Sequence, residues 1–278
     1  MIYDLHSHST ASDGVLTPSL LIARAEQCGV NVLALTDHDI VAGLEEAQQA
    51  ADKHGIGLIP GVEISVTWQK QTIHIVGLGI DRQCQSLLNG LNHLQTIRSQ
   101  RAQEIAQRLE KIGIPDALRG SEKFAPGNNI TRTHFARYLV ELGKARDMND
   151  VFKHFLASGK PGYVQVEWAT LQQAVQWIND AGGRAVVAHP ARYKMTGTKM
   201  GRLLTDFVDC GGAGLEIING GCGRDIIQKY AGLAKRFNLL ASVGSDFHDP
   251  ATPWMDLGKL QPLPRDLTPI WDGMDLNC

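Results

Sequence analysis

The chain has 278 residues, a length that suits one large α/β domain or a domain with an insertion. Hydrophobic residues make up 43% of it and the net charge is −2, so overall charge predicts attraction neither to nucleic acid nor to membranes. Five scattered cysteines without C-x-x-C spacing argue against a disulfide framework or zinc ribbon, and we expect a cytoplasmic protein without a secretory signal or membrane span.

The first part of the chain alternates short apolar runs with helical patterns. Strands are expected over residues 2–6, 31–36, 58–66 and 73–78, and helices over 18–28 and 44–54. The alternation resumes later, with helices over 171–181, 203–210 and 225–237 and strands over 185–188, 215–218 and 239–244. Apolar strands that alternate with helices indicate a parallel sheet, either open or closed into a barrel.

Residues 81–170 interrupt this alternation with a mostly helical segment of different charge. It holds 13 Lys and Arg against 9 Asp and Glu, a net charge of +4, whereas the rest of the chain has a net charge of −6. A basic insertion beside an acidic body predicts an anionic substrate between them, with cations neutralising the body. The alternative is a solvated helical decoration without a binding role.

Imidazole and carboxylate side chains follow one predicted strand after another, mostly at the carboxyl end. Such ends are where α/β barrels build their active sites. The side chains carry nitrogen and oxygen donors without a thiolate, a set that suits a multinuclear site for manganese, iron or zinc. The candidate ligands are His6, His8, Asp13, His38, Glu63, His74, His189, Asp246 and His248.

The motifs H-x-H-x-x-x-x-D-G, T-D-H-D, G-V-E, H-P and S-D-x-H occur in this order, and through them the chain resembles the PHP (polymerase and histidinol phosphatase) family. The resemblance implies a metal-dependent phosphoesterase whose distorted (β/α)7 TIM-like barrel is formed by residues 1–80 and 171–278. Residues 81–170 would form a mainly helical substrate-binding insertion. It also implies three divalent metal ions, with manganese favoured over iron, zinc or magnesium.

The resemblance distributes the ligands over three metals, with Glu63 bridging the first two. The sets are His6, His8, Glu63 and Asp246; then Glu63, His74 and His189; then Asp13, His38 and His248. Residues 130–137 and 159–163 are most similar to the stand-alone branch of nucleoside 3′,5′-bisphosphate phosphatases and 5′-to-3′ exoribonucleases. That branch implies removal of the 3′-phosphate from nucleoside bisphosphates and attack on short 5′-phosphorylated RNA, with no membrane and no obligate protein partner.

Basic residues of the insertion suggest a second anion site. We expect Asn129 or Thr131 to cap a helix with Arg132 and His134 in its first turn, which together with Lys160 would bind a terminal phosphate. Three further assignments concern the chemistry: Arg192 reaches the reacting phosphate, and Asp37 or His134, or else a metal-bound water, protonates the leaving group. Asp37 has the alternative role of orienting His38.

Two other functions stay open on the sequence alone. One is a phosphatase of another small monoester such as histidinol phosphate. The other is a non-enzymatic metal-binding module of a replication assembly, against which the nearly complete ligand set argues.

Overall fold

Seven strands form a nearly closed barrel in the computed structural model, which describes residues 1–127 and 129–274. The strands follow chain order: β1 (Tyr3–Asp4), β2 (Val32–Leu35), β3 (Gly57–Trp68), β4 (Gln71–Leu78), β5 (Arg184–Val187), β6 (Gly214–Asn219) and β7 (Leu240–Gly244). Leu5 N donates to Val243 O at 3.0 Å, which brings β7 beside β1. The predicted distorted, seven-stranded α/β barrel is therefore confirmed.

One strand departs from the expected parallel sheet. β4 pairs antiparallel with both β3 and β5, while the other neighbouring pairs are parallel. Only Gln69 and Lys70, both at positive φ, separate β3 from β4. A connection this short joins antiparallel strands only, because a parallel crossover needs a dozen or more residues. The prediction of a parallel sheet was wrong at β4, and the first strand is shorter than predicted.

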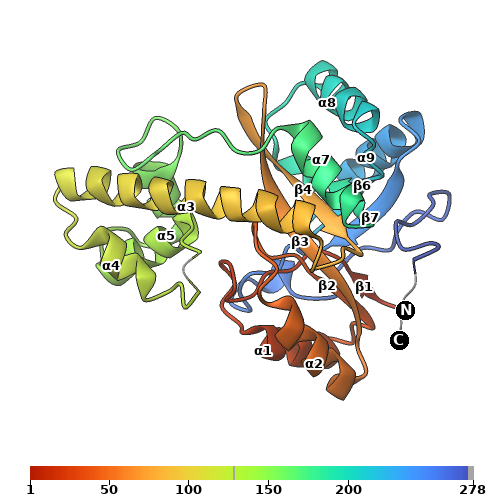
Figure 1. Ribbon diagram of the computed structural model, residues 1–278, viewed down its shortest axis with the longest axis horizontal. Helices are drawn as coiled ribbons and strands as arrows, with labels where there is room; N and C mark the ends of the chain where they lie inside the picture. Colours follow the sequence, from red (N-terminus) through yellow and green to blue (C-terminus); the bar gives the residue numbers. More distant parts are fainter. Residues whose placement is uncertain (128, 275–278) are drawn as a thin grey trace.

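Five helices cover the outside of the barrel. They are α1 (Pro18–Gln27), α2 (Leu44–His54), α7 (Leu171–Asp180), α8 (Gly197–Asp209) and α9 (Arg224–Arg236), with short 3₁₀ turns at Pro190–Arg192 and Pro253–Met255. Figure 1 shows α1 and α2 on one side of the strands and α7, α8 and α9 on the other. Among the residues that the structure describes, no helix combines the length and apolarity of a membrane span.

Alternating strand residues fill two cores. Val32 and Ala34 belong to the cluster inside the barrel, whereas Leu33 and Leu35 belong to the cluster under the helices. Successive side chains of a strand point to opposite faces, so a strand buried on both faces reads as a continuous apolar run. This is why the apolar run over residues 31–36 correctly predicts a buried strand.

The interruption of the alternation is helical, as expected. It contains α3 (Gln85–Lys111), α4 (Ala117–Glu122), α5 (Arg132–Glu141), α6 (Met148–Val151) and a π-helical turn at Phe152–Leu156. α3 runs from the barrel, where it packs on α7, to a smaller helical unit where it packs on α4 (Figure 1). That unit has its own apolar cluster, which includes Leu109, Phe135 and Leu139. The division into two domains at residues 81 and 170 stays a prediction.

Candidate active site

The nine predicted ligand side chains meet at one mouth of the barrel. His6 and His8 follow β1, and Asp246 follows β7, which the backbone bond from Asp246 N to His6 O (2.9 Å) holds beside them. Glu63 was expected near the end of its strand but lies in the middle of β3, because the β3–β4 hairpin extends past the barrel rim. The structure therefore gathers into one cluster side chains that are up to 242 residues apart in the chain.

Left-handed backbone conformations mark three of the loops at this mouth. Asp39 (φ 53°), His189 (φ 28°) and Asp246 (φ 56°) all lie where a side chain is strained. Such residues cost about 1–3 kcal/mol each and cluster at functional sites. These turns come after the strands, and they direct the side chains there toward the inside of the mouth.

Glu63 lies at the centre of the cluster and is fully buried. Its Oε1 is 2.9 Å from both His74 Nδ1 and His189 Nε2, and its Oε2 is 2.8 Å from His38 Nδ1. Two further imidazoles approach at 3.3 and 3.4 Å, those of His6 and His8. One carboxylate that faces several separate nitrogens in this way has the arrangement of a bridging ligand.

The surrounding imidazoles keep Glu63 ionised. Burial alone would raise the pKa of this carboxyl group, but His74, His38 and His6 lower it well below its usual range. For His6 the balance is the reverse: burial would lower its pKa, and Glu63, Asp246 and Glu216 raise it well above the usual value. The cluster therefore favours anionic carboxylates that attract cations.

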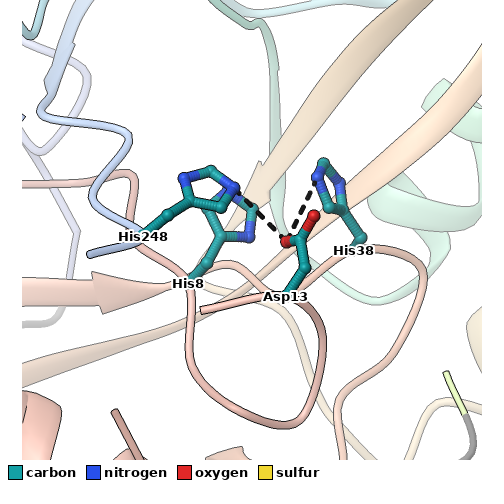
Figure 2. Close-up of side chains that lie close together, drawn as sticks. All are labelled: His8, Asp13, His38 and His248. Carbon is teal, nitrogen blue, oxygen red and sulfur yellow. Dashed lines mark ion pairs between the residues drawn. The ribbon is translucent and has the colours of Figure 1, made fainter. Parts of the chain in front are cut away.

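A second group of donors surrounds Asp13, and Figure 2 shows its four side chains converging. Asp13 Oδ1 is 3.3 Å from His248 Nε2 and 3.7 Å from His38 Nε2. Burial would lower the pKa of His248, but Asp13 and Asp246 raise it to about 9. His8 completes the group, and its pKa falls to about 3 through burial and the neighbouring His248 and His38.

Buried atoms without hydrogen-bond partners show whether these residues fit metal ions. Leaving such an atom unpaired costs about 1–3 kcal/mol, and a cation at the cluster would remove that cost. In the described part of the chain, the candidate-ligand atoms without a hydrogen bond are His6 Nε2, Asp13 Oδ1, His38 Nδ1, Glu63 Oε2 and His189 Nδ1, although His38 Nδ1 and Glu63 Oε2 lie 2.8 Å apart. The donor set therefore fits divalent metal ions.

Geometry groups the ligands much as the predicted sets do, with some differences. His6, His8, Glu63 and Asp246 form one group, each offering a donor atom within 4.8 Å of the others. His8 also belongs to the group of Asp13, and His38 lies close to both Asp13 and Glu63. The third group joins His38, Glu63 and His74, while His189 stands outside it but contacts Glu63 directly.

Sequence reasoning missed Glu216, which supports the cluster from β6. Its Oε2 lies 3.3 Å from His6 Nδ1 and accepts the backbone N–H of His189 at 2.5 Å. Partners of this kind orient metal-ligating side chains. The available signal was one carboxylate inside the otherwise apolar strand of residues 214–218.

Asp37 and His134 are placed differently from the expectation for proton donors. Asp37 is buried and accepts from Ser9 N (2.8 Å), Ser9 Oγ (2.6 Å) and Ser12 Oγ (2.6 Å), so it holds the loop that carries His8 and Asp13. His134 is fully buried, and its Nδ1 accepts from Thr131 N at 3.1 Å in a capping box. Burial lowers the pKa of His134 to about 4. Neither residue lines the cavity between the ligand cluster and the insertion.

A cavity of about 690 Å³ opens between the ligand cluster and the insertion. Arg98, Arg101 and Arg132 line it together. Arg98 donates to Asp39 Oδ2 at 2.7 Å, but within residues 1–127 and 129–274 neither Arg101 nor Arg132 has a carboxylate partner. Burial, then Arg132 and Arg98, lowers the pKa of Arg101 to about 9. This positive charge without a carboxylate partner makes the insertion side of the pocket a candidate anion site.

The other predicted basic contacts divide between pocket and surface. Arg192 lines the pocket and donates to Asp246 and, at 3.1 Å, to Asn219 Oδ1. Lys160 is exposed and does not line the pocket, so the structure does not bring it to the anion site. Sequence reasoning passed over Arg98 and Arg101, although arginines three residues apart in a long helix share one face.

Comparisons with known proteins agree with this geometry. Residues 4–139 match the PHP domain family. A 5′-3′ exoribonuclease from Haemophilus influenzae is 48% identical over 97% of this chain and 98% of its own length. A 3′,5′-nucleoside bisphosphate phosphatase from Chromobacterium violaceum is 46% identical over 98% and 96%. A solved structure of an amidohydrolase from Chromobacterium violaceum, with bound sulfate and no metal, superposes with a TM-score of 0.94 at 46% identity, covering 98% of this chain and 95% of that one.

Proposed function

The chain belongs to the PHP domain family, and we propose that it hydrolyses the 3′-phosphate of nucleoside 3′,5′-bisphosphates and degrades short 5′-phosphorylated RNA from its 5′ end. The observation that carries this proposal is one pocket lined both by the ligand cluster and by Arg101 and Arg132, neither of which has a carboxylate partner among the described residues. A nucleotide with phosphates on both sides of its ribose complements these two groups of side chains.

Three divalent metal ions, with manganese favoured over iron, zinc and magnesium, are part of the proposal. The proposed sets are His6, His8, Glu63 and Asp246; Glu63, His74 and His189; and Asp13, His38 and His248. Ions bound there would supply Lewis acidity for activating water and stabilising charge on the phosphoryl oxygens. The unpaired buried donors of the cluster support this assignment.

The residues of the chain hold and orient the substrate. Arg101 and Arg132 bind the distal 5′-phosphate, which places the 3′-phosphate toward the ligand cluster. Arg192 has donors left over after its bonds to Asp246 and Asn219, since a guanidinium has five N–H groups, and it contacts the reacting phosphate. Asp37 and His134 have positioning roles, because their contacts hold the first ligand loop and the start of α5.

A single-phosphate substrate such as histidinol phosphate would leave Arg101 and Arg132 without a partner, which is why we prefer the bisphosphate. The non-enzymatic module is disfavoured because the relatives that match over nearly the whole chain carry the names of enzymes. We also propose a cytoplasmic location, where nucleotides and RNA are found, without a membrane or an obligate protein partner.

A substrate screen tests the proposal. Protein with measured manganese content would be assayed for release of phosphate from adenosine 3′,5′-bisphosphate, adenosine 3′-monophosphate, adenosine 5′-monophosphate and histidinol phosphate. Short RNA would be compared with and without its 5′-phosphate. We expect the bisphosphate to have the highest kcat/KM and to yield adenosine 5′-monophosphate. Equal or faster turnover of histidinol phosphate, or indifference to the RNA 5′-phosphate, would refute the proposal.

A further inference from the structure

The start of helix α5, in the insertion, contacts the ligand loops of the barrel. Thr131 Oγ1 donates to Asp13 Oδ2 at 3.2 Å, and Arg137 Nη2 donates to the backbone oxygen of Asp13 at 2.7 Å. Asn129 Nδ2 donates to the backbone oxygen of His38 at 2.8 Å. Asn129 and Thr131 are buried, so water does not replace these bonds easily. Two candidate ligands from the barrel are thus tied to one short segment of the insertion.

The two carboxylate oxygens of Asp13 have different surroundings. Oδ2 accepts from Thr131, whereas Oδ1 is buried without a hydrogen-bond partner and faces His248 Nε2 and His38 Nε2, as Figure 2 shows. The terminal torsion of an aspartate is broad and weakly restrained by itself. The hydroxyl of Thr131 therefore supplies the restraint that aims the free oxygen at the two imidazoles.

On the premise of the metal centre proposed above, we propose that Thr131 and Arg137 are positioning residues for Asp13, and that the insertion thereby contributes to binding the metal ion assigned to Asp13, His38 and His248. Groups that hold a ligating side chain from outside typically change metal affinity by about 10- to 100-fold when they are removed. The insertion then has two tasks on one helix: Arg132 faces the substrate anion, and its neighbour Thr131 holds a metal ligand.

Thr131 also caps its helix, so its role toward Asp13 must be separated from helix capping. Its Oγ1 accepts from Thr133 N at 3.1 Å while its hydroxyl proton goes to Asp13. Thr170 provides a matched control because it begins α7 with the same capping box, but its hydroxyl donates to Gln173 Oε1 (3.1 Å) and not to a candidate ligand. A substitution at Thr170 removes a similar cap and leaves the ligand cluster untouched.

The experiment compares Thr131→Val, Thr131→Ser and Thr170→Val with the unmodified protein. Each protein is titrated with Mn²⁺, and bound metal per chain is measured by elemental analysis after dialysis and by electron paramagnetic resonance of free Mn²⁺. We expect Thr131→Val to weaken one class of site by about 10- to 100-fold, and Thr131→Ser to restore it. Thr170→Val should keep every site, although its midpoint of thermal unfolding falls comparably. Asp13→Ala identifies the affected class, because it should remove the same ion.

Unchanged Mn²⁺ affinity in Thr131→Val, or an equal loss in Thr170→Val, would overturn the positioning role. If Thr131→Val does not fold, Arg137→Met gives the same test through the second bond to Asp13 and should weaken the same class of site. Because the measured quantity is metal binding without substrate, its result is separate from that of the substrate screen. A protein that prefers the bisphosphate but binds Mn²⁺ equally well in all these variants would refute this inference alone.

Discussion

Removal of Arg101 should weaken binding of the distal phosphate without harming the free protein. Arg101 lines the pocket beside Arg132, and in the described residues no carboxylate pairs with either of them. Its bonds within the protein are a 3.3 Å hydrogen bond to Val164 O and a contact of its guanidinium with the Trp168 ring, 5.3 Å from the ring centroid. Arg101→Met keeps the length of the side chain and removes the charge.

The structure sets the size of the expected effect. A hydrogen bond to a charged group contributes about 1.5–3 kcal/mol, which corresponds to a loss of roughly ten- to a hundredfold in kcat/KM. For the free protein the expected change is small, because burial and the neighbouring arginines already lower the pKa of Arg101. Relief of this repulsion should offset the lost contact with Trp168, so the midpoint of thermal unfolding should stay nearly constant.

The assay compares two substrates on each protein. Adenosine 3′,5′-bisphosphate carries the distal phosphate and adenosine 3′-monophosphate lacks it, so the ratio of the two effects isolates the contact. Arg101→Met and Arg132→Met should each lose roughly ten- to a hundredfold on the bisphosphate and little on the monophosphate. Lys160→Met is the matched control, since Lys160 is exposed outside the pocket and its loss should change neither substrate by more than about twofold.

Equal losses on both substrates would refute this reasoning, because they would place the arginines at the reacting phosphate or in the fold. An effect of Lys160→Met as large as that of Arg101→Met would support the sequence-based expectation that Lys160 binds the terminal phosphate. It would contradict the assignment of that phosphate to the arginines of the cavity alone.

Four further variants test the cluster, its supports and the packing of the fold. Glu63→Gln should lower bound metal at more than one site together, since both carboxylate oxygens face candidate ligands; full metal content by elemental analysis would contradict a bridging role. Gly244→Ala should lower the midpoint of thermal unfolding, because a Cβ there would collide with the side chain of His6. The overpacking would cost about 1–3 kcal/mol. Gly232→Ala, with open space in α9, should raise the midpoint by an amount equivalent to roughly 0.5–1 kcal/mol, and similar shifts for the two variants would count against the packing. Arg98→Met should destabilise the protein by about 3–5 kcal/mol in urea unfolding because it leaves the buried carboxylate of Asp39 without its ion-pair partner, and a loss below about 1 kcal/mol would show that the ion pair is dispensable.

The sequence by itself determined which nine candidate ligands the cluster contains. In a barrel whose strands follow chain order, each strand end delivers its side chains to the same mouth, so order along the chain predicts proximity in space. His6, His8 and Asp246 can be placed together in this way from their positions in the chain. The helix over residues 44–54 is predictable to the residue, because its apolar spacing and the terminating Gly55 are local properties of the chain.

Only the tertiary structure decided which hydrogen bonds and ion pairs each of these side chains makes. Asp37 has the sequence position of an available acid, yet two serines 25 and 28 residues away in the chain bind its carboxylate. Arg101 and Arg132 lie on different helices, and no local pattern shows that both face one cavity while Lys160 does not. Composition shows which chemical groups a chain carries, and periodicity shows on which face of a helix or strand each side chain lies. Which group stays free to bind a ligand depends on contacts between distant segments, and those exist only in the folded chain.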